Sequence, residues 1–289
     1  MKPGWYAALA LVLVALAGTI CSLQLRIDAS KGEDEVVEEF MRLPDAEYLK
    51  AVSLGFDEMV ADVLWLKAVQ HMGERRISGR GYDWIYTALD TVTSMDPRFI
   101  PPYETGGLIL TIEAEKVDLS NRLLEKGMLN NPDVWQFPYY LGFNYSYFLK
   151  DYKRAARYIR RAAEMEGSPK YMPMLASRLF VQADDTETSI GFLQTIYERS
   201  SDERTRKFVL DRINKLRALN TARALQKVVD RYKEINGRRP ADLSALVREG
   251  IIDRVPEEPS GGYYYIDNDG VVRSSKVEKS LGVHTLGSR

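Results

Sequence analysis

The sequence contains a single cysteine, Cys21, and only two histidines, His71 and His284. One cysteine cannot build a disulfide framework, and these three residues are too few for a Cys/His metal cluster. The same shortage excludes most Cys–His and Ser–His–Asp nucleophilic sites made within one chain. We therefore expect no catalytic residue, no metal and no cofactor, and we look for function in the surfaces of the protein.

Carboxylates are the remaining side chains that could support catalysis. A helical hydrolase that uses a glutamate would need paired carboxylates facing a cleft. Two acidic pairs are present, Glu113/Glu115 and Asp184/Asp185, and they are better explained as surface and turn residues. The sequence thus predicts a protein that is not an enzyme.

Net charge is also small, at −1 for the 289 residues, but its distribution is uneven. Residues 1–149 hold 13 basic and 21 acidic side chains (net −8), residues 150–239 hold 21 and 12 (net +9), and residues 240–289 hold 6 and 8 (net −2). The middle of the chain should therefore present a basic surface. This surface is either a solvated helix face or a site for an acidic partner or anionic lipid.

An apolar stretch without any charge covers Trp5–Leu25. As a helix rising about 1.5 Å per residue, it is long enough to cross a hydrocarbon core of about 30 Å. Lys2 and the free amino group favour a cytoplasmic N-terminus. We therefore expect a single-pass membrane anchor over residues 1–26, followed by an acidic linker over residues 27–39.

A cleaved signal peptide is the main alternative to this anchor, and it stays open. Ala15–Ala17 has the small-x-small pattern of a cleavage site, but the apolar run continues eight residues beyond it, which favours an uncleaved segment. Lipidation of Cys21 is disfavoured, because the bulky Ile20 stands where a lipoprotein signal has a small residue.

The stretch Pro138–Pro169 divides into two helical halves at Lys150–Asp151. In each half, small and aromatic residues recur at helical spacing, so two antiparallel helices can approach closely. These residues are Leu141, Gly142 and Tyr145 in the first half and Ala155, Ile159 and Ala162 in the second. The stretch resembles a tetratricopeptide repeat, whose pattern is Leu-Gly-x-x-Tyr on helix A, then Ala, a large apolar residue and Ala on helix B, then Pro.

This central repeat is one residue longer than the family pattern. Leu141 and Ala155 are fourteen positions apart, where the family has thirteen, so we expect a lengthened turn between the two helices. One repeat buries too little surface to fold alone. Pro97, Pro132 and Pro169 follow one another at 35 and 37 residues and should each end a helix, at a spacing close to the family period of about 34.

We therefore expect an all-α fold in which residues 40–235 form a tetratricopeptide-like helical solenoid. Ser78–Gly81 should be a loop, and Gly106–Gly107 a close helix contact. The first helix carries an apolar stripe made of Val60, Leu64, Ala68 and Met72. The expected helices cover Leu54–Met72, Tyr82–Met95, Pro102–Lys116, Asp118–Leu129, Tyr171–Gln182, Thr186–Arg199 and Asp202–Ile235, in addition to those of the central repeat.

Residues 236–275 predict a small C-terminal module, in which Gly237 ends the long helix. A short helix over Pro240–Glu249 and two strands around an Asn-Asp-Gly turn should follow. The segment is similar to the C-terminal part of type II secretion pseudopilins, although the membrane segment stands about two hundred residues away here. A hairpin that caps the solenoid is the simpler interpretation, and residues 276–289 should be disordered.

As a whole, the chain looks like a bacterial membrane-anchored tetratricopeptide protein. This resemblance implies a noncatalytic scaffold in the inner membrane, with its solenoid in the periplasm, that binds other proteins of the cell envelope. In such arrays helix A lines the concave face, where partners bind. The partner-binding residues expected on helix A are Gln136, Tyr140, Phe143, Asn144 and Tyr147, although they could equally pack on the neighbouring repeat. The basic surface on helix B consists of Lys153, Arg154, Arg157, Arg160 and Arg161.

Nucleic acid is not an expected partner, because an exported domain does not meet it. The C-terminal likeness supplies an alternative function, that of an assembly factor or structural subunit of a pilus or type II-like secretion machine. The sequence leaves open the identity of the partner, the process that is served and self-association.

Overall fold

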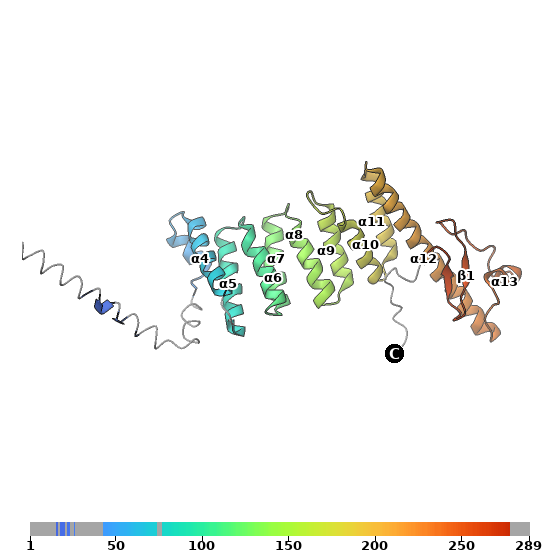
Figure 1. Ribbon diagram of the computed structural model, residues 1–289, viewed down its shortest axis with the longest axis horizontal. Coiled ribbons are helices and arrows are strands. Elements are labelled where there is room, and N and C mark those ends of the chain that lie inside the picture. Colours follow the sequence, from blue (N-terminus) through green and yellow to red (C-terminus); the bar gives the residue numbers. More distant parts are fainter. Residues whose placement is uncertain are drawn as a thin grey trace, which may run out of the picture. The chain divides into compact units, whose positions relative to one another are not determined.

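The computed structural model describes residues 43–73 and 77–277, together with a few isolated positions between residues 16 and 26. These residues are mostly helical and include one two-stranded sheet, which confirms the predicted all-α class (Figure 1). The chain divides into two compact units, Met1–Leu123 and Leu124–Arg289.

The predicted anchor and acidic linker lie outside the described residues, apart from the isolated positions, as does the tail after Val277. Within the part of the chain that the structure describes, no helix has the length and apolar character needed to cross a membrane.

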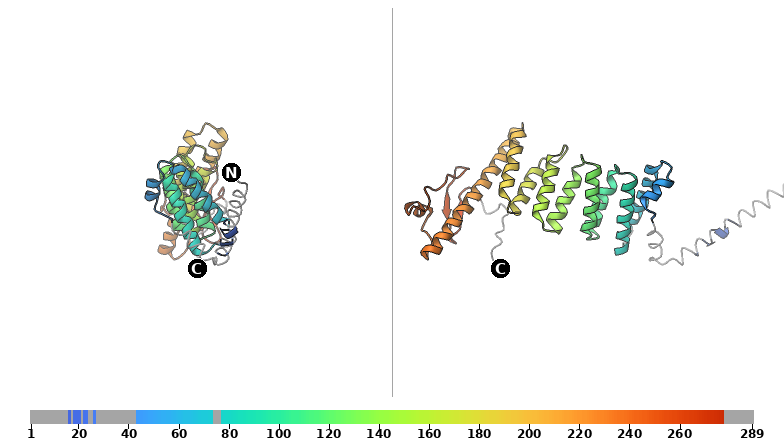
Figure 2. Two further views of the ribbon diagram at one scale, coloured as in Figure 1. Left: turned by 90° about the vertical axis from the view of Figure 1, so that its left-hand side faces the viewer. Right: turned by 180° about the vertical axis from the view of Figure 1, so that it is seen from behind.

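In the first unit, helices that are neighbours in sequence lie side by side (Figures 1 and 2). α4 contacts α3 and α5, and α5 contacts α6. The core is the apolar face of α5, where Trp84, Ile85, Leu89 and Val92 are buried at helical spacing. The helices are α3 (Ala46–Val52), α4 (Asp57–Met72), α5 (Gly79–Met95) and α6 (Ile100–Ile112), and α7 (Val117–Asn130) begins in this unit.

Two glycine pairs of the first unit have different roles. The predicted loop over Ser78–Gly81 is wrong, because the Ser78 hydroxyl accepts a hydrogen bond from the Gly81 N–H at 3.1 Å and α5 begins at Gly79. Gly106 is a close helix contact as predicted, since a Cβ atom there would overlap the side chains of Leu89 and Leu123.

The second unit continues this arrangement of neighbouring helices. α9 lies between α8 and α10, and α11 lies between α10 and α12. The elements are α8 (Gln136–Phe143), the π-helix η1 (Asn144–Phe148), α9 (Tyr152–Glu164), α10 (Met172–Gln182), α11 (Thr186–Arg199), α12 (Glu203–Asn236), α13 (Leu243–Arg248), β1 (Tyr264–Ile266) and β2 (Val272–Ser274). The predicted order of helices is confirmed, although α6 stops four residues before the predicted Lys116 and α9 five residues before Pro169.

The helix crossing predicted for the central repeat is present in the second unit. Leu141, Tyr145, Ala155, Ile159 and Ala162 are all buried. A Cβ atom on Gly142 would lie 2.5 Å from the Ile159 side chain and 3.2 Å from the Ala155 carbonyl oxygen. The absence of a side chain at Gly142 is therefore what lets α8 approach α9.

The extra residue of the central repeat is not in the turn, so the predicted lengthened turn is wrong. It is absorbed by η1, where the Leu149 N–H donates to the Asn144 carbonyl five residues earlier. Only Leu149 and Lys150 separate η1 from Asp151, which caps α9. Lys150 makes this short connection possible by adopting the left-handed conformation, with φ 53°.

α12 is one helix of 34 residues that packs against two different clusters. Val209, Ile213 and Leu216, in its first half, pack with residues of α11. Its second half, from Ala218 to Tyr232, packs with α13 and the β-hairpin. Gly237 ends the helix in the left-handed conformation with φ 67°, as predicted.

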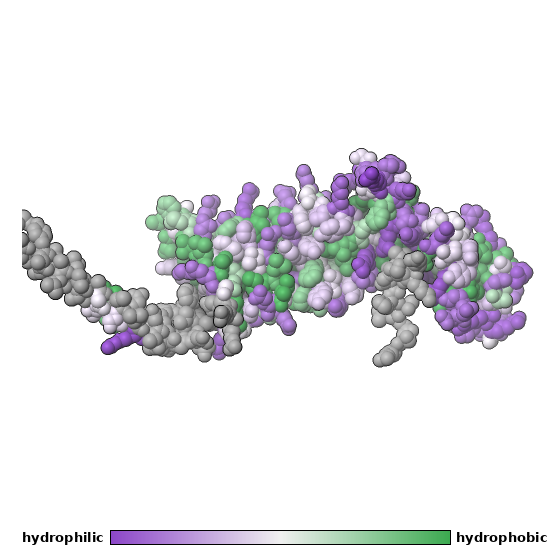
Figure 3. Space-filling model, in the orientation of Figure 1, coloured by the Kyte–Doolittle hydropathy of each residue, from purple (hydrophilic) through white to green (hydrophobic). Residues whose placement is uncertain are grey.

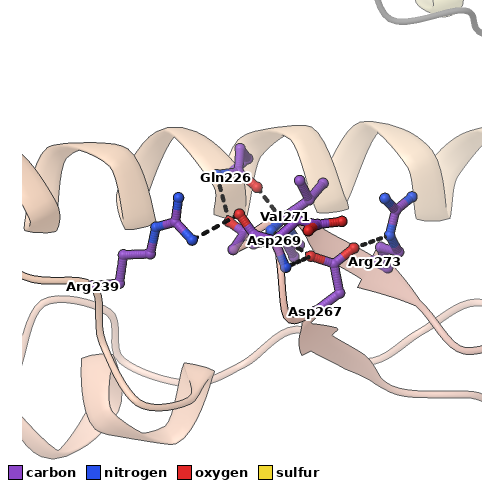
Figure 4. Close-up of polar contacts among 8 residues, drawn as sticks. Gln226, Arg239, Asp267, Asp269, Val271 and Arg273 are labelled. Carbon is purple, nitrogen blue, oxygen red and sulfur yellow. Dashed lines mark hydrogen bonds and ion pairs between the residues drawn. The ribbon is translucent and has the colours of Figure 1, made fainter.

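The C-terminal hairpin is joined to α12 through its turn (Figure 4). β1 and β2 are antiparallel, with Tyr265 opposite Arg273. The Gln226 side chain of α12 accepts from the Val272 N–H at 2.7 Å and donates to the Gly270 carbonyl at 3.3 Å. Asp267 forms an ion pair with Arg273 and accepts from the Val271 N–H at 2.9 Å, which closes the turn. The predicted hairpin is therefore confirmed.

Gly142→Ala tests the helix crossing. We expect the added methyl group to lower the free energy of unfolding by about 1–3 kcal/mol, because Ile159 and the α9 backbone leave no room for it. Gly191→Ala is the matched control, since nothing lies within 4 Å of a Cβ atom at that helical position. It should raise stability by about 0.4–1 kcal/mol. Equal effects of the two substitutions in chemical unfolding would contradict the role assigned to Gly142.

Candidate functional site

Three aromatic side chains of α8 and η1 form a continuous group, which we call the aromatic surface and define as Phe143, Tyr147 and Phe148. The rings of Phe143 and Tyr147 stack at a centroid distance of 5.4 Å and an angle of 6°. Phe148 meets Tyr147 edge-on at 4.9 Å, and the Lys150 ammonium lies 5.0 Å from the centre of the Tyr147 ring. These contacts hold the exposed ring of Tyr147 in a defined orientation.

Four of the five predicted partner-binding residues are accessible in part or in full. Tyr147 is 61% exposed, whereas Gln136, Tyr140 and Phe143 are half-buried. The prediction for Asn144 is wrong, because its exposed fraction is only 2%. Asn144 precedes the buried Tyr145 and shares its side of the helix, so its side chain is turned away from solvent.

Two residues that follow Tyr147 were not predicted as surface residues from the sequence. Phe148 completes the ring cluster, and Leu149, 48% exposed, follows it. Both come directly after Tyr147 in the segment where η1 replaces a regular helical turn. A Phe-Leu pair before a helix–helix turn is an ordinary core signal, so the sequence did not indicate that Phe148 would contact the Tyr147 ring.

The basic residues predicted on helix B all lie exposed on α9. Two of them are engaged within the chain. The Arg154 guanidinium donates to Asp151 at 2.6 Å and lies 4.7 Å from the Tyr145 ring centre, and Arg160 lies 3.6 Å from Glu164. The Arg154 backbone N–H and guanidinium lower the pKa of the Asp151 carboxyl group.

The other three basic residues of α9 recur every four positions and form no ion pair with a described residue. They are Lys153, Arg157 and Arg161. This spacing places them on successive turns of one helix face, where an acidic partner could reach all three.

A half-buried tyrosine of α9, Tyr158, packs against the buried side of η1. Tyr158 of α9 stacks on Tyr145 at 5.4 Å and donates a hydrogen bond to Glu125 at 3.0 Å. Burial, with the nearby Glu125 carboxylate, raises the pKa of Tyr158 to about 12. Its hydroxyl therefore remains a donor over the whole physiological pH range.

The acidic pairs occupy the positions expected from the sequence. Glu113 and Glu115 are exposed at the end of α6. Asp184 forms an ion pair with Arg223 at 3.0 Å, and Asp185 caps α11 by accepting from the Thr188 N–H. Among the described residues, no group of three or more His, Cys, Asp or Glu side chains is arranged to hold a metal ion.

The C-terminal module contains an open depression of about 570 Å³ between β1 and the start of α13. Its buried carboxylate, Glu258, accepts hydrogen bonds from the N–H groups of Ser260 and Gly262 at 2.8 and 2.9 Å. The Ser274 hydroxyl donates to the other oxygen of Glu258 at 3.0 Å. This carboxylate thus fixes the loop that leads into β1.

A second apolar surface, on α4, was not predicted. We call it the outer stripe and define it as Phe56, Met59, Val63 and Leu66, all exposed. Figure 3 shows hydrophobic residues gathered at the α3–α4 end of the described chain. The apolar stripe predicted from the sequence lies on the opposite side of α4, where Ala68 is buried and Val60, Leu64 and Met72 are half-buried. The predicted stripe is therefore the face of α4 that packs in the core, and the exposed apolar face was not predicted.

No protein family matches the chain, and no curated protein is significantly similar to it. Functional inference must therefore start from the chain's own surfaces. Among the described residues, the aromatic surface and the outer stripe are two groups that offer apolar contact area.

Tyr158→Phe tests the contribution of the hydrogen bond from Tyr158 to Glu125. Loss of the hydrogen bond to Glu125 should lower the free energy of unfolding by about 1 kcal/mol at neutral pH. Because the folded pKa is raised above the ordinary value near 10, the contribution of Tyr158 is complete below pH ~10 and is lost as pH rises towards ~12. The stability of the unsubstituted protein should therefore fall more steeply over this range than that of the variant.

Chemical unfolding at several pH values measures this difference. Tyr263→Phe, at an exposed position, should change stability by less than about 0.5 kcal/mol. A Tyr158 variant with the same alkaline slope as the unsubstituted protein would contradict the assignment.

Proposed function

We propose that this protein is a noncatalytic adaptor of the bacterial cell envelope, anchored in the inner membrane, whose tetratricopeptide-like helices bind partner proteins. The observation that carries this proposal is the aromatic surface, because it is ordered by its own ring contacts and still exposes Tyr147. An ordered aromatic group loses little conformational freedom on binding and offers a large contact area.

The type of partner follows from the composition of this surface. Its three aromatic rings and the adjoining Leu149 give an apolar centre, and Lys150 adds a positive charge beside the Tyr147 ring. An apolar peptide segment or helix face with an acidic residue beside it would satisfy both features. A protein segment is therefore the class of partner that we propose.

The tetratricopeptide-like character is supported by the central hairpin. α8 and α9 meet at Gly142 and Ile159, the small and large residues that the repeat pattern requires at these positions. Within the second unit, the following helices pack in sequence order, α10 on α9 and α11 on α10. Such neighbour-by-neighbour packing is typical of repeat proteins.

The membrane anchor is proposed from the sequence alone, on the uncharged run Trp5–Leu25. With Lys2 in the cytoplasm, the rest of the chain would lie in the periplasm. An adaptor with this topology would hold its partner close to the outer leaflet of the inner membrane.

Photocrosslinking in cells tests partner binding. A photoreactive phenylalanine analogue at Tyr147 should give a discrete adduct with a partner protein, identified by mass spectrometry. The same analogue at Phe208 of α12 is the matched control, because this aromatic residue is equally exposed, at 61%, and lies outside the aromatic surface. Adducts of equal yield at both positions, or none at Tyr147, would refute the proposed site.

Reporter fusions after Arg289 test the topology independently. Alkaline phosphatase fused there should be active, because this enzyme folds in the periplasm, and a cytoplasm-restricted fluorescent protein should be dark. The opposite pattern would place the helical body in the cytoplasm and remove the envelope assignment without affecting the binding surface.

A further inference from the structure

α4 is apolar on opposite sides, although only one side is covered in the described chain. Its inner side packs on α5 through Ala61 and Ala68, both fully buried. Its outer stripe remains open, with exposed fractions of 63% for Phe56, 60% for Met59, 51% for Val63 and 60% for Leu66. An exposed row of large apolar side chains on a helix is typical of an interaction surface, so we looked for an occupant of the outer stripe.

The spacing of the outer stripe is that of a coiled-coil seam. Phe56, Met59, Val63 and Leu66 are separated by three, four and three residues, which corresponds to positions a, d, a and d of two heptads. Ala61 and Ala68 then fall at position f, opposite the seam, which agrees with their burial against α5. The pattern indicates that the occupant is another helix, running roughly along α4.

The charges beside the seam indicate which helix this is. In the same heptad frame, Asp62 is at position g and Lys67 is at position e of the next heptad. Both are exposed, and neither forms an ion pair with a described residue. In a parallel pair of identical helices, position g of each chain faces the following position e of the other. Asp62 of each copy would therefore face Lys67 of the other copy, which gives two attractive charge pairs.

We propose that the outer stripe is a self-association surface, on which α4 of a second copy packs in parallel and in register about a twofold axis. In an antiparallel pair, like charges would face each other at both positions, Asp62 against Asp62 and Lys67 against Lys67. The parallel arrangement is therefore the one that the charges favour. Self-association through the outer stripe goes beyond the proposed partner binding and does not depend on it.

A lipid surface fits the outer stripe less well than a second copy. α4 carries Asp57, Glu58 and Asp62 against the single Lys67, so anionic headgroups would repel it. Interfacial helices are instead rich in Lys and Arg on their polar face. The negative charge of α4 thus favours a second copy of the chain over an anionic lipid surface as the occupant.

The length of the seam sets the strength of association. Two heptads are too short to hold free helices together, but α4 is already folded against α5 and loses no helical order on pairing. Exposed Val52 and Leu54, just before α4, add apolar area at one end of the seam. We expect a reversible dimer, whose dissociation constant is on the order of micromolar.

Cysteine crosslinking of the full chain tests the register. Leu66→Cys in a Cys21→Ser background should give a disulfide-linked dimer on mild oxidation, because equivalent d positions face each other in a parallel pair. Leu129→Cys is the matched control, since Leu129 is a leucine of α7 with 79% exposure that lies outside the outer stripe. It should remain monomeric under the same conditions.

Charge reversal, read by sedimentation of the full chain in neutral detergent, tests the orientation. Asp62→Lys and Lys67→Asp should each weaken association about tenfold, and the double variant should restore it, because reversed pairs attract again. Leu66→Glu should abolish association, with an unchanged melting temperature because the residue is exposed. The comparison also excludes association through the N-terminal apolar run, which none of these substitutions alters.

Several results would overturn the proposal. These are a Leu66→Cys chain that stays monomeric, association that is unaffected by Leu66→Glu, and single charge variants that associate as strongly as the unsubstituted chain. Binding to lipid vesicles that requires Leu66, without dimer formation, would assign the stripe to a membrane surface instead.

Discussion

The second unit depends on the contact between a backbone and a side chain at one helix crossing. At Gly142, α8 approaches α9 so closely that the Ile159 side chain occupies the space of the missing Cβ atom. α9 is thereby fixed against α8, and its buried Ala155, Ala156 and Ile159 also share a core cluster with residues of α10. This one cluster is built from residues of η1, α9, α10 and α11, among which three alanines take little space.

The same crossing determines what the neighbouring surface presents. Leu141 and Tyr145 are held inward, so the rings of Phe143 and Tyr147, on the other side of the helix, are turned outward. Phe148, the last residue of the π-helix η1, joins the ring cluster through Phe143 and Tyr147. Packing and the proposed partner binding thus use opposite sides of one short segment, and a change on the buried side would disturb both.

The sequence predicts those features that depend on local chemistry. Small residues at helical spacing located the crossing at Gly142, a left-handed glycine located the end of α12, and an Asn-Asp-Gly turn located the hairpin. The sequence did not predict features for which two different local structures fit the same residues equally well. The one residue by which the central repeat exceeds the family spacing could lengthen either the turn or a helix. It is accommodated in the π-helix η1, where Asn144 is buried. Likewise, periodicity identifies one apolar side of α4 but does not tell that the side bearing Val63 is left uncovered.

The continuity of α12 has a mechanical consequence for the C-terminal hairpin. Because 34 residues form one helix of about 51 Å, the part that packs on α11 and the part that carries the hairpin cannot rotate separately. Gln226 fastens the hairpin turn directly to this helix. A force applied to the hairpin would therefore move α12 as one rigid helix and would reach the part of α12 that packs on α11.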